Sequence, residues 1–296
     1  MGNIIGIDLG TTFSAVARLD ETGRPQIVTN AEGGNITPSV VEFLSETSFG
    51  VGKEAKKMIG KTKTIVPLGP NDEAKRHMGS TSKTYKFFNE TFTPVDISAL
   101  ILKKIKEDVE AKHGDIDSAV VTVPANFSNS EKEATMEAAQ KAGLSVTSVI
   151  NEPTAAALAY SFLSEKELNG TFVIYDLGGG TFDCTIARVK GQDVEILTSE
   201  GVRELGGKDF DNIIVNNVEK QYKDATGKDL IDFSINEAEE LKISLSARKT
   251  VRTSVTTADG FADITITRED FEEDISGLIV QAEMAIESAL SRLDLS

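Results

Sequence analysis

At 296 residues, the chain is long enough for two ordinary domains or for two lobes with a cleft between them. Its 47 acidic and 31 basic residues give a formal charge of −16. That charge argues against nucleic acid or an anionic membrane as the main partner, because both are polyanions. The single cysteine, Cys184, cannot form an internal disulfide and predicts a reducing, cytoplasmic location.

The first predicted element is a buried strand that begins at Ile4 and ends in Asp-Leu-Gly-Thr-Thr at residues 8–12. Gly10 permits a tight turn, so that backbone N–H groups can curl around an anion, and the hydroxyls of Thr11 and Thr12 add donors. Asp8 at the mouth of such a loop would repel phosphate unless a cation lay between them. The segment therefore predicts a phosphate loop that also binds a metal ion.

Residues 38–93 are polar and irregular, and they predict a small insertion instead of a main core. From the sequence alone, Lys75 within this insertion is expected to be a solvated surface charge. The helical period returns over residues 97–112, where apolar residues recur on one face.

Two buried strands are predicted over residues 119–123 and 146–150, on either side of a helix that begins at a capping box, Ser128–Glu131. An alanine-rich helix follows and places Glu152 directly after the second strand. Open α/β sheets place their sites at such strand ends. The alternative role of Glu152 is a favourable interaction with the helix dipole.

Residues 172–183 repeat the pattern of the first loop: an apolar run, Asp176, three consecutive glycines and Thr181, with Asp183 shortly after. One such loop alone could be a glycine-rich hairpin, and one or two of the acids could merely cap turns. Two loops that face one another predict a clamp on a metal-bound polyphosphate. Neither loop has the spacing of a Walker loop or a dinucleotide fingerprint.

The last third of the chain predicts a helix with an apolar stripe over 210–222 and another that begins near Asn236 with Glu239 at its cap. Exposed strands over 251–267 and a long amphipathic helix over 269–293 follow. Strands that lead into helices predict an α/β fold.

Four stretches of the sequence resemble the seventy-kilodalton heat-shock chaperones of the DnaK type. They are Ile-Asp-Leu-Gly-Thr-Thr at 7–12, Val-Thr-Val-Pro-Ala at 121–125, Asn-Glu-Pro-Thr-Ala-Ala-Ala at 151–157 and Asp-Leu-Gly-Gly-Gly-Thr-Phe-Asp at 176–183. Leu-Gly-Gly-Lys-Asp-Phe-Asp at 205–211 extends the match, which covers nearly the whole chain in order. The resemblance implies the N-terminal ATPase domain, with an actin-like fold of two lobes, each split into two subdomains, around a nucleotide cleft.

The implied domain boundaries follow the predicted elements. Residues 1–37 and 92–169 would form the core of lobe I, and residues 38–91 its small subdomain. Residues 170–207 and 277–296 would form the core of lobe II, and residues 208–276 its small subdomain on the adenosine side.

The resemblance also implies roles for single residues. Lys75 would orient the attacking water, which reverses the expectation of a solvated charge. Glu152 and Asp176 would hold Mg²⁺ through water, and Asp8 and Asp183 would lie near a monovalent cation, expected to be K⁺. The implied catalytic residues are Lys75, Glu152, Asp176 and Thr181. The implied nucleotide-binding residues are Gly10, Thr11, Thr12, Gly178, Gly179, Gly180, Thr181, Gly206, Gly207, Glu239, Lys242 and Ser246.

The chain also departs from the family pattern. It stops at Ser296, where family members continue into a strand, a turn and a helix, and then a linker and a peptide-binding domain. We therefore expect a C-terminally truncated domain with weakened nucleotide affinity and an uncovered sheet edge that favours association. Ser148 stands where the family often has an arginine that contacts J-domain partners, which weakens the prediction of a J-domain co-chaperone or a nucleotide-exchange factor as partner.

The predicted function is slow hydrolysis of ATP to ADP and phosphate, impaired to some degree by the truncation. In the family this reaction controls how a peptide-binding domain grips unfolded polypeptides. Two alternatives remain within the same superfamily. A small-molecule kinase would need an acceptor pocket with a general base, and a filament-forming ATPase is disfavoured by the charge of −16.

Overall fold

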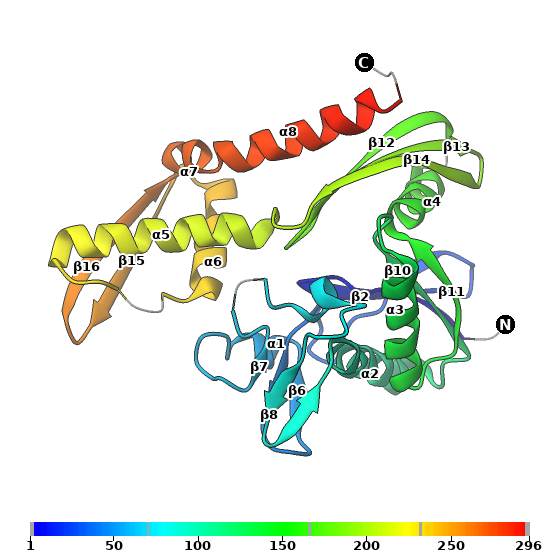
Figure 1. The fold of residues 1–296 in the computed structure, drawn as a ribbon, viewed down its shortest axis with the longest axis horizontal. Coiled ribbons are helices and arrows are strands. Elements are labelled where there is room, and N and C mark those ends of the chain that lie inside the picture. Colours follow the sequence, from blue (N-terminus) through cyan, green and yellow to red (C-terminus); the bar gives the residue numbers. More distant parts are fainter. Residues whose placement is uncertain (1–2, 70, 165–166, 231–232, 294–296) are drawn as a thin grey trace.

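The computed structural model describes residues 3–69, 71–164, 167–230 and 233–293, and we call residues 3–164 lobe I and residues 167–293 lobe II (Figure 1). The strands of lobe I are β1 (Ile4–Asp8), β2 (Phe13–Leu19), β3 (Pro25–Ile27), β4 (Thr37–Pro38), β5 (Val41–Phe43), β6 (Phe49–Val51), β7 (Ile65–Val66), β8 (Tyr85–Phe87), β9 (Glu90–Phe92), β10 (Ser118–Val123) and β11 (Val146–Asn151). Its helices are α1 (Lys53–Lys56), the 3-10 helix η1 (Ala74–His77), α2 (Pro94–His113), α3 (Asn129–Lys141) and α4 (Glu152–Ser164).

Lobe II begins with the strands β12 (Asn169–Leu177), β13 (Phe182–Lys190) and β14 (Asp193–Val202). It continues with α5 (Gly207–Thr226), α6 (Ile235–Ala247), β15 (Thr250–Thr257), β16 (Gly260–Thr267), α7 (Arg268–Asp274) and α8 (Ser276–Ser291).

The main sheet of lobe I has the strand order β11-β10-β1-β2-β3. Strands β1, β10 and β11 run parallel, so their carboxyl ends meet at one edge, whereas β2 pairs with β1 in the antiparallel sense. Alternation along β1 buries Ile5 and Ile7 against apolar residues of α2 and α3. This packing fixes the edge at which Asp8 and Glu152 are presented.

The predicted elements of lobe I are confirmed, with one extension. Helix α3 begins at the predicted capping box, in which Ser128 and Glu131 exchange both bonds. Helix α2 starts earlier than the periodicity indicates, because Thr93 caps it and Pro94 occupies its first turn.

The insertion between β4 and α2 holds short strands and is not a separate irregular segment. Its aromatic side chains stack, with the ring centroids of Phe43 and Phe87 4.7 Å apart, and they belong to the same core as Ile97 of α2. Strands of two or three residues are too short to give a readable alternation, which is why the sequence indicated only irregular structure.

Lobe II consists of two packed units. The antiparallel sheet β12-β13-β14 packs on α8, and the hairpin β15-β16 packs on α5 and α6. In Figure 1, α8 runs from the hairpin unit to the sheet and joins the two. The register of the sheet places Asp176 directly opposite Asp183.

Two expectations for lobe II need correction. The helix predicted over 269–293 is interrupted at Ile275, where Ser276 and Gly277 follow, and Gly/Ser pairs are common at helix kinks. Asn236 and Glu239 do not cap α6, whose N-cap is Ser234. Instead, Asn236 donates to the carbonyl oxygen of Lys56 at 3.0 Å, and Glu239 pairs with the Lys56 ammonium group, so both side chains contact lobe I.

Strand β12 is an edge of its sheet and pairs, among the described strands, with β13. Its side chains Val173, Tyr175 and Leu177 are 49%, 51% and 41% exposed. An apolar edge strand of this kind is a template for pairing with another chain. Among the described residues β12 is therefore an open edge of its sheet, whereas association through this edge stays a prediction. Within the described residues, no helix is both long and apolar enough to cross a membrane.

Candidate functional site

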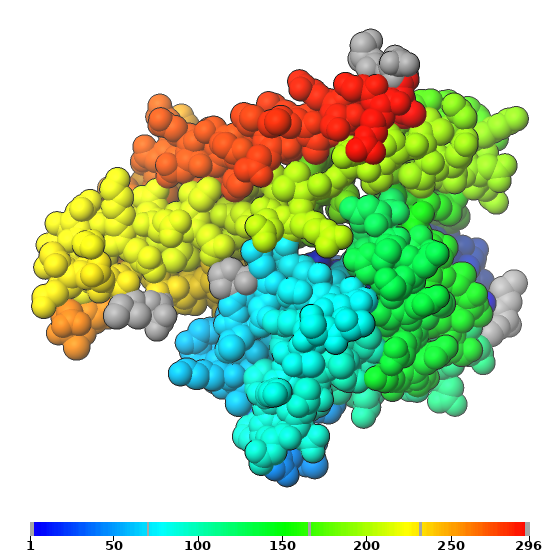
Figure 2. All heavy atoms as spheres, in the orientation of Figure 1, coloured from blue at the N-terminus to red at the C-terminus, as the bar shows by residue number. Residues whose placement is uncertain are grey.

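The two predicted phosphate loops meet at a cavity of about 570 Å³ between the lobes. The cavity is lined from lobe I by the turn between β1 and β2 and from lobe II by the turn between β12 and β13. In Figure 2, the segment after β14 lies directly against the cyan residues of the lobe I insertion, so the lobes are in contact on this side.

The first loop, between β1 and β2, is tightly folded. A Cβ atom on Gly10 would overlap the carbonyl oxygen of Phe13, so the turn requires glycine here. The Thr12 hydroxyl is buried and has no hydrogen-bond partner among the described residues. A buried hydroxyl without a partner is costly, and a bound oxyanion would satisfy it.

The second loop, between β12 and β13, is held by backbone hydrogen bonds. Gly178 N–H donates to Thr181 O at 2.9 Å, and Gly207 N–H at the start of α5 donates to Gly178 O at 3.0 Å. A Cβ atom on Gly179 would overlap the Thr12 side chain, and one on Gly206 would overlap the backbone at Gly180. The glycines therefore allow the two loops and the start of α5 to pack together.

Three of the four predicted carboxylates, Asp8, Glu152 and Asp176, line this cavity, and the fourth, Asp183, lines the cavity next to it. Asp8 ends β1 and accepts a hydrogen bond from the Thr122 hydroxyl at 3.0 Å, whereas Glu152 is the first residue of α4. Asp176 and Asp183 face each other across β12 and β13. The four acids thus come from two strand ends, a helix start and a strand start.

Lys75 of η1 is 11% exposed, and its ammonium nitrogen lies 2.6 Å from Glu152 Oε1. It also lines the cavity. The sequence-based expectation of a solvated charge is therefore wrong, because the insertion folds back and places the lysine against a carboxylate.

Three of the acids, Glu152, Asp176 and Asp183, have raised pKa values. Burial raises the pKa of Glu152, with Asp8 and Asp176 adding to the shift against the attraction of Lys75. Asp176 is open to the cleft, yet desolvation by the surrounding protein raises its pKa, and Asp8 raises it further. Burial is the largest cause that raises the pKa of Asp183, and Glu152 and Asp176 raise it further, to about 6. Desolvation by burial is the largest cause of all three shifts, and repulsion among the acids adds to it.

The residues expected to contact adenosine are only partly brought together. Glu239 of α6 lines a neighbouring cavity of about 260 Å³ with Lys56. Lys242 donates to Gly207 O at 2.8 Å and pairs with Asp211 at 2.7 Å, so it holds the start of α5. The side chain of Ser246 is exposed, one and a half to two turns from Glu239.

These residues fit a metal-bound polyphosphate. Loop glycines and an unsatisfied threonine hydroxyl suit phosphate oxygens, and carboxylates with raised pKa values need a cation nearby. Within the described part of the chain, no three His, Cys, Asp or Glu side chains lie close enough to bind one ion directly. The predicted contact of Mg²⁺ with Glu152 and Asp176 through water needs no such group.

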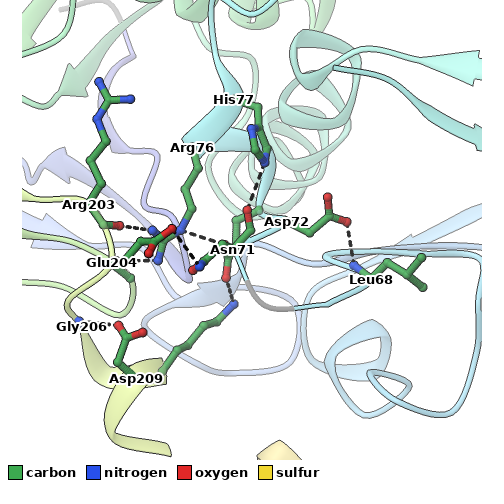
Figure 3. Close-up of polar contacts among 12 residues, drawn as sticks. Leu68, Asn71, Asp72, Arg76, His77, Arg203, Glu204, Gly206 and Asp209 are labelled. Carbon is green, nitrogen blue, oxygen red and sulfur yellow. Dashed lines mark hydrogen bonds and ion pairs between the residues drawn. The ribbon is translucent and has the colours of Figure 1, made fainter. Parts of the chain in front are cut away.

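Several residues of the cleft escaped the sequence reading. Arg76, next to Lys75, donates to the carbonyl oxygens of Gly180 and Arg203, and Figure 3 shows its guanidinium reaching the Arg203 backbone. Glu73 is 1% exposed between Arg76 and Lys208, and it pairs with both. The motif Glu-Ala-Lys-Arg carries no periodicity, so only the fold reveals these contacts.

Asn126 was also missed. Its side-chain nitrogen donates to Asp183 Oδ1 at 3.2 Å. One signal in the sequence would have singled it out. Asn126 lies three residues after the end of β10, at the edge where the parallel strands end.

The sequence matches a protein-family model over most of its length. The model described as Hsp70 protein matches residues 4–87 and 74–296, and the two matches together span nearly the whole sequence.

Proposed function

Because the chain belongs to the Hsp70 family, whose members are in general ATPases that bind ATP and ADP with Mg²⁺, we propose that it is the nucleotide-binding domain of a DnaK-type chaperone. Its α/β architecture is that of the actin-like ATPase fold of this family. In this proposal it binds Mg-ATP and Mg-ADP and hydrolyses ATP slowly. The observation that carries the proposal is the convergence of both glycine loops, Lys75 and three of the acids, Asp8, Glu152 and Asp176, on one cavity.

In the proposed site, the two loops hold the phosphate chain. Backbone N–H groups of the glycines, with the hydroxyls of Thr11, Thr12 and Thr181, donate to phosphate oxygens. Magnesium, when bound, would neutralise phosphate charge, and Glu152 and Asp176 would hold it through water. Asp8 and Asp183 are the proposed neighbours of a monovalent cation, K⁺.

Lys75 has two tasks in this proposal. Its ammonium group, held by Glu152 at 2.6 Å, is fixed where it can orient a water molecule toward the terminal phosphorus. Its positive charge also stabilises the charge on the phosphoryl group during transfer. The site needs no covalent intermediate, because positioning and electrostatic stabilisation suffice for this chemistry.

In the whole system we propose that nucleotide state controls a peptide-binding domain and, through it, unfolded polypeptides. Members of the family work with such substrates and with co-chaperones. A J-domain co-chaperone and a nucleotide-exchange factor are proposed with less support, because Ser148 replaces an arginine often found there. A cytoplasmic location likewise rests on the single cysteine.

Single-turnover hydrolysis of radiolabelled ATP tests this proposal. We expect phosphate to be released to water without any added acceptor, and EDTA to abolish the reaction. Transfer that depends on an added small-molecule acceptor would favour the kinase alternative instead. Nucleotide-dependent pelleting would favour the filament-forming alternative.

A further inference from the structure

A further cavity, of about 290 Å³, lies next to the phosphate loops, and we call it the second cavity. Thr11, Lys75 and Thr181 line both this cavity and the larger one. These three side chains therefore form the partition between the two cavities. In the proposed function, Lys75 lies beside the terminal phosphate, and Thr11 and Thr181 donate to phosphate oxygens.

Both lobes contribute walls to the second cavity. Asn71 and Arg76 come from lobe I and Arg203 and Glu204 from lobe II, and Asn71 donates to Glu204 Oε1 at 3.2 Å. Figure 3 shows the Arg203 side chain pointing away from Arg76. It is 74% exposed, so the outer end of the cavity reaches solvent.

The charge of the lining suits passage of an anion better than its retention. The cations Lys75, Arg76 and Arg203 are matched by the acids Asp183, Glu204 and Glu131. Arg203 lies 3.8 Å from Glu131, and because the arginine is 74% exposed, this ion pair is weak and easily exchanged. A tetrahedral oxyanion that passes through the cavity would accept hydrogen bonds along it. No uncompensated cluster of cations among the lining residues would retain it there.

We propose that the second cavity is the exit through which inorganic phosphate leaves after hydrolysis, whereas ADP leaves through the larger cavity. The proposal rests on the ATPase function. The water oxygen bonds to the terminal phosphorus, the bond from that phosphorus to the bridging oxygen of ADP breaks, and the water proton passes to phosphate or solvent. Phosphate then lies at the partition, with ADP between it and the mouth of the larger cavity.

The test is to fill the second cavity with the substitution Asn126→Trp. Asn126 lines this cavity and not the larger one. The chain has no tryptophan, so the new indole is the sole tryptophan reporter, and blue-shifted emission shows that it lies inside the cavity. The matched control Asn126→Ala loses the same hydrogen bond to Asp183 without filling the cavity.

Three rates are measured for each variant: hydrolysis by acid quench, phosphate release with a fluorescent phosphate sensor, and dissociation of a fluorescent ADP analogue. Relative to the alanine control, we expect the tryptophan variant to release phosphate about tenfold more slowly, a barrier increase of ~1.4 kcal/mol, with ADP dissociation unchanged. Unchanged phosphate release with a buried indole would overturn the proposal. Equal slowing of phosphate and ADP would also overturn it, because it indicates a shared exit.

If the indole emits as an exposed one, the same comparison is made with Val202→Trp and Val202→Ala, because Val202 lines the cavity from lobe II. A failure of the proposed ATPase function would be detected separately, in the acid-quench measurement of hydrolysis. Acid-quenched samples of the unsubstituted chain that contain no ADP would contradict the ATPase function itself, and the phosphate exit with it.

Discussion

Lys75, whose side chain is 11% exposed, lies against Glu152 in the cleft, and its removal is expected to separate hydrolysis from binding. We predict that Lys75→Met lowers the single-turnover rate of ATP hydrolysis by about 100-fold or more, because water positioning and charge stabilisation are both lost. The affinity for Mg-ADP should stay within about threefold, since ADP lacks the terminal phosphate that the lysine faces. Lys86→Met, on the exposed face of β8, is the matched control. Equal losses of hydrolysis in the two variants would contradict the assignment.

Asp183 should make the stability of the metal-free protein depend on pH. Its pKa is raised from 3.8 to about 6, so between these values the folded state binds more protons than the unfolded state, and stability falls as pH rises. We predict that Asp183→Asn removes the part of the pH-dependent loss of stability that this carboxyl causes. The stability of the variant relative to the parent chain should rise by roughly 2–3 kcal/mol between pH 4 and pH 7, at about 1.4 kcal/mol for each pH unit.

The measurement is a pair of urea titrations, at pH 4 and pH 7 in EDTA, on the two chains. The other acids are present in both chains, so the difference reports on Asp183 together with its repulsion of Glu152 and Asp176. A difference that is independent of pH would show that the carboxyl titrates normally.

At this scale the sequence predicted the strand-end acids well and the lysine poorly. Asp8, Glu152 and Asp176 follow apolar runs, and strand ends at one edge of a sheet must converge. Lys75 and Glu152 are 77 positions apart, and an irregular segment gives no period from which such a contact can be inferred. Only the resemblance to a family pointed to the lysine.

At the level of elements, the turns at the two loops require glycines, because a side chain would not fit there. A Cβ atom on Gly179 would overlap Thr12, so we predict that Gly179→Ala destabilises the fold by about 1–3 kcal/mol and weakens Mg-ADP binding, because one loop must move. Gly277→Ala is the matched control. Nothing lies within 4 Å of a Cβ built on Gly277 in α8, and alanine there should add up to about 1 kcal/mol through helix propensity. Thermal melts and titration calorimetry measure both effects, and a neutral Gly179→Ala would contradict the tight contact of the loops.

Helices were predicted where local chemistry specifies them. The capping box at Ser128 gives the start of α3, because its two bonds lie within four residues. The start of α6 near Asn236 is confirmed, but the predicted cap is wrong, because Asn236 and Glu239 contact Lys56 instead. The same residue types can cap a helix or contact a distant part of the chain, so the sequence alone does not distinguish the two roles.

On the scale of the whole molecule, ion pairs join the lobes across the cleft. Glu73 of lobe I pairs with Lys208 of lobe II, and Lys56 pairs with Glu239. These pairs link segments 135 and 183 positions apart, which no local pattern predicts. They lie beside the cavities, so they favour a closed cleft.

We predict that Lys208→Glu accelerates ADP release by about tenfold. The substitution places a second negative charge beside Glu73, which is 1% exposed, and a buried charge that loses a partner is costly. Arg76 still pairs with Glu73 and limits the effect. Lys220→Glu changes the same charge on the exposed face of α5 and should leave the rate unaltered. Stopped-flow release of a fluorescent ADP analogue measures both variants, and equal rates would show that the pair does not restrain opening.

The central claim is that the two glycine loops form a working clamp on a metal-bound nucleotide. A thermal melt of the protein with and without Mg-ADP, repeated with EDTA, tests it most directly. At a hundred times its dissociation constant, Mg-ADP should add roughly 2.7 kcal/mol of stability, which for a chain of this size is on the order of 5–10 °C in melting temperature. A shift of this size that EDTA abolishes is the predicted result. No shift, or a shift that persists in EDTA, would contradict the account.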